Sequence, residues 1–107
     1  MPKIGDHAVV LGAGMAGLLA ARVLAGCTVV MKPAGPTPAT AEALVAILHE
    51  AGLPRGVLNL VIGRGRVGQA IVESPYIRAV SFTGSVPTGR RIGAQCFETN
   101  KKFQLEM

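Results

Sequence analysis

Short apolar segments alternate with segments of helical periodicity along the whole chain. Five short segments, of which the first four are mainly apolar, predict strands at residues 7–11, 27–31, 57–62, 78–82 and 102–106. The segments between them predict helices at 18–25, 38–51, a short stretch ending near 73, and 86–98. No linker or low-complexity stretch interrupts this alternation, so we expect one domain over residues 1–107.

Strands that are almost continuously apolar are typical of a parallel sheet with helices on both faces. Right-handed crossovers, with a reversal of winding after the third strand, give the strand order 3-2-1-4-5. The predicted fold class is therefore α/β, a three-layer, Rossmann-like, doubly wound parallel sheet of five strands. Ligands of such sheets bind at the carboxyl ends of the strands, where three glycine-rich turns fall in this sequence.

The first of these turns has the spacing of a dinucleotide-binding motif. It consists of Gly12, Gly14 and Gly17 and lies between a predicted strand and a predicted helix. The first glycine would permit the tight turn, the second would admit a pyrophosphate, and the third would allow close packing of helix on strand. A strand-to-helix turn without a ligand is the alternative.

Composition and charge exclude several classes of protein. Half of the residues are hydrophobic and mean hydropathy is +0.44, which suits a folded core, and no apolar run reaches membrane-spanning length. Without a secretory signal pattern, we expect a cytoplasmic protein. The net charge of +5 could attract nucleic acid, but only four aromatic residues are available to stack on bases, so no nucleic-acid partner is expected. Cys27 and Cys96 fit no metal-ligand spacing and are predicted to be buried thiols.

From about residue 25 onward the sequence resembles the coenzyme-binding domain of the aldehyde dehydrogenase superfamily. The similarity is carried by residues 25–34, 51–59, 80–85 (VSFTGS), 88–92 and 105–107 (LEM), which occur in the family's order. Residues 1–24 instead resemble the opening of flavin-dependent oxidoreductases and lack the family's oxyanion-stabilising asparagine. The sequence is therefore interpreted as a chimera, natural or engineered, joined near Ala25 and Gly26, with an engineered minimal domain favoured.

The resemblance implies several coenzyme-binding positions. Lys32 corresponds to a lysine that contacts the adenosine ribose, and Gly35 stands where many members have a ribose-binding glutamate. Ser85 corresponds to a serine that contacts the pyrophosphate, although a helix cap is an equally good interpretation, and Gly84 would let the backbone approach the ligand. A second glycine turn, which includes Gly63 and Gly65, lies nearer the adenine in the family.

The same resemblance assigns Glu106 to the family's general base, but the cysteine nucleophile lies beyond residue 107 in those enzymes. We therefore expect a structural domain without catalysis of its own, and not an enzyme. The alternatives are a dinucleotide-binding module and, less favoured, a flavin- or nicotinamide-dependent oxidoreductase. The expected coenzyme is NADP or NAD, with FAD less favoured. Exposed sheet edges, guarded at one end by Lys101 and Lys102, also predict a homodimer.

Overall fold

The computed structural model describes residues 7–11, 26–35 and 38–107, and the following description is confined to them. Its strands are β1 (His7–Leu11), β2 (Thr28–Lys32), β3 (Leu58–Leu60), β4 (Ile77–Thr83) and β5 (Lys102–Glu106). Its helices are α2 (Pro38–Glu50), α3 (Gly65–Glu73) and α4 (Val86–Glu98). The α/β class predicted from the sequence is confirmed.

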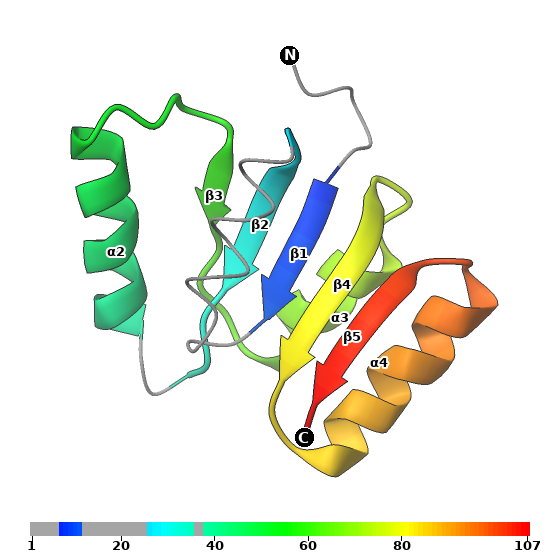
Figure 1. Cartoon of the computed structure of the whole chain (residues 1–107). Coiled ribbons are helices and arrows are strands. Elements are labelled where there is room, and N and C mark those ends of the chain that lie inside the picture. Colours follow the sequence, from blue (N-terminus) through cyan, green and yellow to red (C-terminus); the bar gives the residue numbers. More distant parts are fainter. Residues whose placement is uncertain (1–6, 12–25, 36–37) are drawn as a thin grey trace.

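All neighbouring strands are parallel, and their order in the sheet is β3-β2-β1-β4-β5 (Figure 1). The short β1 therefore lies at the centre, with β2 on one side and β4 on the other. In the register, Leu11 is opposite Lys32 on β2 and opposite Phe82 on β4. The carboxyl ends of β2 and β4 consequently flank the end of β1, where the winding of the chain reverses.

Two hydrophobic clusters cover opposite faces of this sheet. Val29 and Met31 of β2 pack with α2 and β3 in one cluster, whereas Val30 between them packs against the other. Because successive side chains of a strand point to opposite faces, the two clusters lie on opposite sides. The second cluster joins Val72 of α3 to Cys96 of α4.

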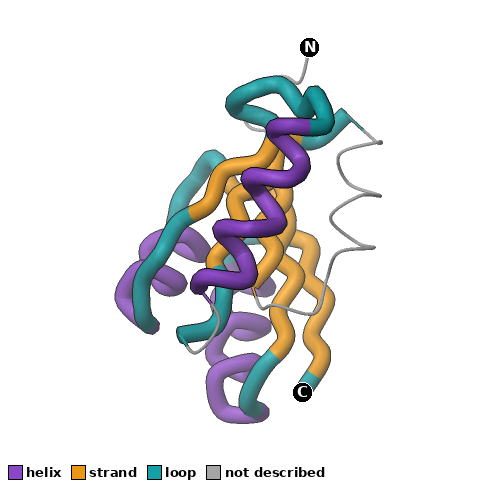
Figure 2. The backbone as a smooth tube through the Cα atoms, turned by 90° about the vertical axis from the view of Figure 1, so that its left-hand side faces the viewer, coloured by secondary structure: helices purple, strands orange, loops and turns teal. Residues whose placement is uncertain are grey.

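The helices follow this division, with α2 on one face and α3 and α4 together on the other (Figures 1 and 2). Helices on both faces are what nearly continuous apolar strands require. The predicted helix over residues 18–25 lies outside the described residues. Burial of both faces leaves the rim formed by the strand ends as the place where polar side chains gather.

Candidate functional site

A cavity of about 250 Å³ opens at the carboxyl ends of β2 and β4. It is lined by Lys32, Ala34, Phe82, Thr83, Gly84, Ser85 and Thr88. Three of the predicted coenzyme-binding residues, Lys32, Gly84 and Ser85, thus come together from segments about 50 residues apart, as a parallel sheet requires. We call this space the strand-end cavity.

Ser85 occupies the N-cap position of α4, but its side chain does not cap the backbone. Its hydroxyl donates a hydrogen bond to Thr88 Oγ1 at 3.0 Å, and Arg91 donates to the same oxygen at 3.4 Å. No side-chain hydrogen bond therefore caps the start of α4, where Val86 and Thr88 carry backbone amides and Pro87 has no N–H. A helix start of this kind favours an anion through its free N–H groups and its dipole.

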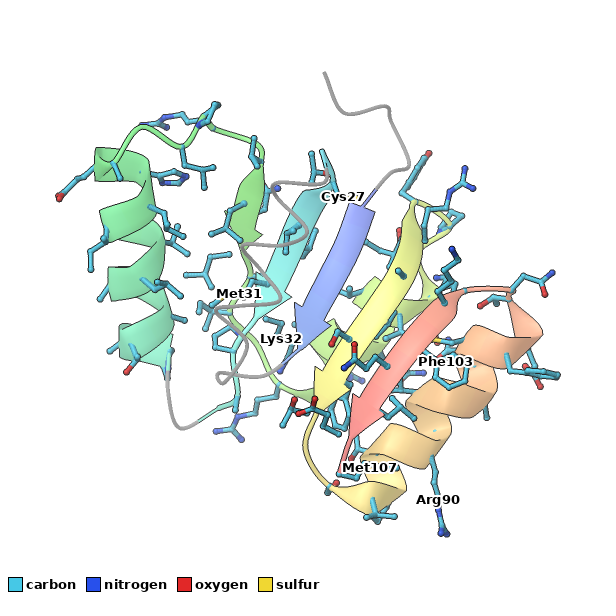
Figure 3. The ribbon with its side chains drawn as sticks, in the orientation of Figure 1. Cys27, Met31, Lys32, Arg90, Phe103 and Met107 are labelled. Carbon is cyan, nitrogen blue, oxygen red and sulfur yellow. The ribbon has the colours of Figure 1, made fainter. Side chains whose placement is uncertain are left out.

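Lys32 brings a positive charge to the same rim (Figure 3). Its side chain is half-buried, and its ammonium donates a long hydrogen bond of 3.4 Å to the carbonyl of Pro33. The aliphatic stem runs beside α3, because a methyl group built at Gly68 would lie 3.6 Å from Lys32 Cδ. The end of the Lys32 side chain thus lies beside Gly68, near the start of α3.

Gly35 and Gly65 are exposed positions beside the site, with open space where a side chain would be. Gly63 is different, since a Cβ there would lie 2.6 Å from Val67 Cβ. The glycine at 63 therefore serves the packing of the turn against α3. The predicted residues Gly12, Gly14 and Gly17 lie outside the described residues.

A second groove of about 340 Å³ runs between α3 and α4. It is lined by Gly65, Gly68, Gln69, Val72, Thr88, Arg91, Ile92 and Gln95. Thr88 lines both this groove and the strand-end cavity, so the two spaces meet at this residue. Sequence reasoning missed Thr88 and Arg91, although the spacing of three residues from Ser85 to Thr88 and on to Arg91 places them on one helix face.

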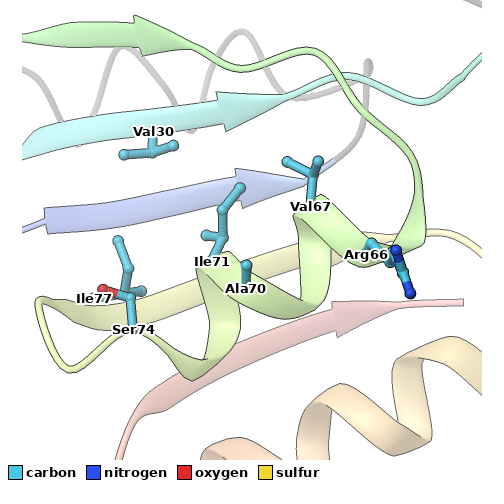
Figure 4. Close-up of a pocket in the computed structure, with 7 residues that line it drawn as sticks. All are labelled: Val30, Arg66, Val67, Ala70, Ile71, Ser74 and Ile77. Atoms are coloured by element: carbon cyan, nitrogen blue, oxygen red, sulfur yellow. The ribbon is translucent and has the colours of Figure 1, made fainter.

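A third hollow, of about 420 Å³, lies between α3 and the sheet (Figure 4). Its walls are mostly aliphatic, and Figure 4 shows Val30, Val67 and Ile71 facing it, with Arg66 near one end. None of the predicted site residues lines this hollow. Few polar groups converge on this hollow, so we attribute it to incomplete packing between α3 and the sheet and not to a binding site.

Glu106 ends β5 with an exposed side chain, and its carbonyl accepts a hydrogen bond of 3.1 Å from the amide of Gly84. Its neighbour Leu105 packs into the cluster on the α3 and α4 face, so the Glu106 side chain points to the opposite face. The candidate base is thus tied through its backbone to the turn before α4. Its carboxylate does not share the strand-end cavity.

Two residues near the other end of the sheet, Cys27 and Lys101, differ from what the sequence predicted. Cys96 is fully buried, as predicted, and burial raises the pKa of its thiol; Cys27 is half-buried, and both are free thiols. Lys101, expected to guard a strand end, is 9% exposed and donates hydrogen bonds to the carbonyls of Val72 and Ser74 at the end of α3. Burial lowers the pKa of Lys101.

Within the part of the chain that the structure describes, no three His, Cys, Asp or Glu side chains gather as ligands for a metal ion. None of its helices combines the length and apolar character that a membrane crossing requires.

Comparison with known proteins places this geometry in a family. The model of the aldehyde dehydrogenase family matches residues 13–107. The chain belongs to the aldehyde dehydrogenase family. It is 46% identical over 84 residues to the NADP(+) succinate-semialdehyde dehydrogenase of Escherichia coli, covering 78% of this chain and 17% of that enzyme. Identity to glutarate-semialdehyde dehydrogenase of Pseudomonas putida is also 46% over 84 residues, covering 78% and 18%.

Solved aldehyde dehydrogenase structures show the same fold. A lactaldehyde dehydrogenase matches with a TM-score of 0.88 and 38% identity, covering 98% of this chain and 24% of that one. An aldehyde dehydrogenase of Mycobacterium tuberculosis complexed with NAD+ matches with a TM-score of 0.83 and 39% identity, covering 98% and 23%. The chain spans less than a fifth of the length of the curated relatives it matches.

These matches overturn the interpretation of the chain as a structural chimera without catalysis, and with it the expectation that it is not an enzyme. The family match begins at residue 13, inside the segment that was attributed to flavin enzymes, and its relatives are aldehyde dehydrogenases. The error came from the glycine spacing after β1. A glycine spacing of this kind does not by itself identify a lineage.

Proposed function

We propose that this chain is part of the coenzyme-binding region of an NAD(P)-dependent aldehyde dehydrogenase, and that the strand-end cavity holds the phosphates and the adenosine ribose. The observation that carries this proposal is the convergence of Lys32 and the uncapped start of α4 on one cavity. A cation and free backbone amides at the switch point of a parallel sheet suit a dinucleotide. The three-layer, doubly wound arrangement belongs to the same proposal, supported by helices on both faces.

The roles of the individual residues follow from where they lie. Ser85 and the first turn of α4 would hold the pyrophosphate, and Lys32 would contact the ribose or a phosphate on it. Gly35 and Gly65 leave open space beside these groups, so the ligand could pass close to the backbone there. Gly63 would act indirectly, by setting the turn that leads into α3.

The charges favour NADP over NAD. Lys32 lies in the cavity, Arg64 and Arg66 are exposed at the start of α3, and Gly35 presents no carboxylate that would repel a 2′-phosphate. A partly solvated cation near such a phosphate is worth on the order of 1 kcal/mol, which is several-fold in affinity. FAD gains nothing from this arrangement, since it has no 2′-phosphate.

For the whole enzyme we propose the oxidation of an aldehyde, with semialdehydes as candidate substrates. The relatives that carry this proposal are named as dehydrogenases of succinate and glutarate semialdehyde. The coenzyme would supply the hydride acceptor. From this chain, Glu106 is the candidate general base, and its backbone bond to Gly84 ties its position to the coenzyme turn.

Calorimetric titration of the 107-residue chain with NADP+ and with NAD+ tests the binding function. NADP+ should bind several-fold more tightly, and Lys32→Met should remove most of that preference. Lys102→Met, on the exposed side of β5, is the matched control and should leave both affinities unchanged. An equal response to both coenzymes would refute the 2′-phosphate argument, and no heat with millimolar amounts of either would refute the binding site.

A homodimer through the β5 edge also remains a proposal. β5 is terminal in the sheet and pairs with β4 on one side, and the Phe103 side chain on it is 44% exposed. An edge strand with exposed backbone groups and an aromatic side chain is prone to pair with another strand.

A further inference from the structure

Gly84 lies in the turn between β4 and α4, yet its backbone does not require a glycine. Among the described glycines, a positive φ occurs at Gly26, Gly52 and Gly56, and Gly84 is not one of them. An alanine could therefore adopt the backbone conformation at position 84 without strain. The need for a small residue must come from what surrounds the position.

The surroundings are dominated by one aromatic ring. A Cβ built on Gly84 would lie 2.6 Å from Phe82 Cζ and 3.2 Å from both Phe82 Cε atoms. Phe82 is 9% exposed and belongs to the cluster of Val80 and Cys96, so its ring is held by its neighbours. A packed ring cannot move aside as the end of a flexible side chain can.

The same ring reaches the second turn of α4. A Cβ at Gly89 would lie 3.5 Å from Phe82 Cε1, an ordinary contact distance. Phe82 also lines the strand-end cavity, together with Ser85 and Lys32. One side chain therefore contacts the turn, the helix that follows it and the floor of the cavity.

We infer that Phe82 is a positioning residue for the turn at Gly84 and Ser85, which we call the coenzyme turn. Its ring fixes the distance of this turn from the sheet and thereby directs the first amides of α4 toward the ligand. This inference rests on the proposed coenzyme site. It also assigns the glycine at 84 to the ring and not to close approach of the ligand, which is the role expected from the sequence.

A double-mutant cycle separates the two roles. In the full chain, Gly84→Ala should weaken NADP+ binding about tenfold, because the methyl group pushes the turn away from the ring. Phe82→Leu removes the ring atoms that cause the overlap. If Phe82 is responsible, Phe82→Leu with Gly84→Ala should bind NADP+ within about threefold of Phe82→Leu alone. Gly89→Ala is the control: its methyl group meets the same ring at ordinary distance and overlaps only the exposed, flexible side chain of Met107, so this variant should bind like the wild type.

Two results would overturn the inference. If the double variant binds as weakly as Gly84→Ala, the methyl group obstructs the ligand directly, and if Gly84→Ala binds like the wild type, the ring does not set the turn. Should the wild type bind no coenzyme, the proposed function fails while the cycle is still measured by urea unfolding. Favourable coupling between the two substitutions then supports contact between ring and turn, and additivity refutes it.

If Gly84→Ala does not fold, the positioning role of Phe82 is tested by hydrogen exchange of the Gly84 amide in Phe82→Leu. That amide donates to the Glu106 carbonyl, so loss of the ring should speed its exchange about tenfold relative to amides of α2. Unchanged protection would refute the positioning role.

Discussion

Lys101→Met is expected to destabilise the chain by about 2 kcal/mol. The ammonium of Lys101 donates to the carbonyls of Val72 and Ser74, where α3 ends, and its side chain is 9% exposed. Hydrogen bonds to a charged donor contribute about 1.5–3 kcal/mol each, and a cation at a helix C-terminus adds about 0.3–1 kcal/mol. Removal of a buried charge from a site that disfavours it offsets part of this loss.

The assay is equilibrium urea unfolding followed by circular dichroism at pH 7. For a domain of this size, a loss of 2 kcal/mol corresponds to a melting temperature lower by about 10 °C. Lys102→Met is the matched control, because the side chain of Lys102 is exposed. This substitution should change stability by less than about 0.5 kcal/mol. A Lys101→Met protein as stable as this control would refute the capping role.

The pH dependence of this difference is fixed in sign. Burial lowers the pKa of Lys101, so the folded chain releases the proton at a lower pH than the unfolded chain. The unfolded state then binds more protons between the lowered pKa and the ordinary lysine pKa of about 10.4. The stability gap between the wild type and Lys101→Met should therefore widen as pH rises through that window.

Three further outcomes are expected. Because burial raises the pKa of the Cys96 thiol, this residue makes wild-type stability fall as pH rises past the ordinary cysteine pKa of about 8.5, and Cys96→Ala should remove that contribution in pH-dependent unfolding. Gly63→Ala should cost about 1–3 kcal/mol by overlap with Val67, whereas Gly68→Ala should be tolerated; equal unfolding midpoints would contradict this. Phe103→Lys should abolish any dimer seen by light scattering above micromolar concentration, and persistence of the dimer would exclude the β5 edge.

The parallel arrangement was predictable because each strand is a short apolar segment between helical ones. α4 and β5 have the predicted bounds, and Ser85 at the N-cap position and Pro87 in the first turn mark the start of α4. β3 is shorter than predicted: its pairing with β2 ends with the hydrogen bond from the Val61 amide to the Met31 carbonyl, while the apolar pattern continues to Ile62, which is 51% exposed. Hydrophobicity alone does not separate a strand from an apolar loop.

The site was predictable only in part. Lys32 and Ser85 follow strands that end at the same edge of the sheet, so their proximity follows from the topology. Thr88 and Arg91 could not be distinguished from an ordinary solvated helix face, because their role depends on how closely α3 approaches α4. Lys101 is buried and Lys102 is exposed because the end of α3 lies beside Lys101. The residues around these two lysines carry no information about the position of α3.

The position of β1 at the centre of the sheet has a consequence for synthesis of the chain. Of the five strands, His7–Leu11 is translated before the others, and its partner on one side, Thr28–Lys32, follows shortly afterwards. Its other partner, Ile77–Thr83, does not exist until most of these residues have been translated. On the ribosome, one edge of the central strand therefore remains open throughout the synthesis of α2, β3 and α3, and a ribosome that stalls in this interval would expose that edge to pairing with other chains.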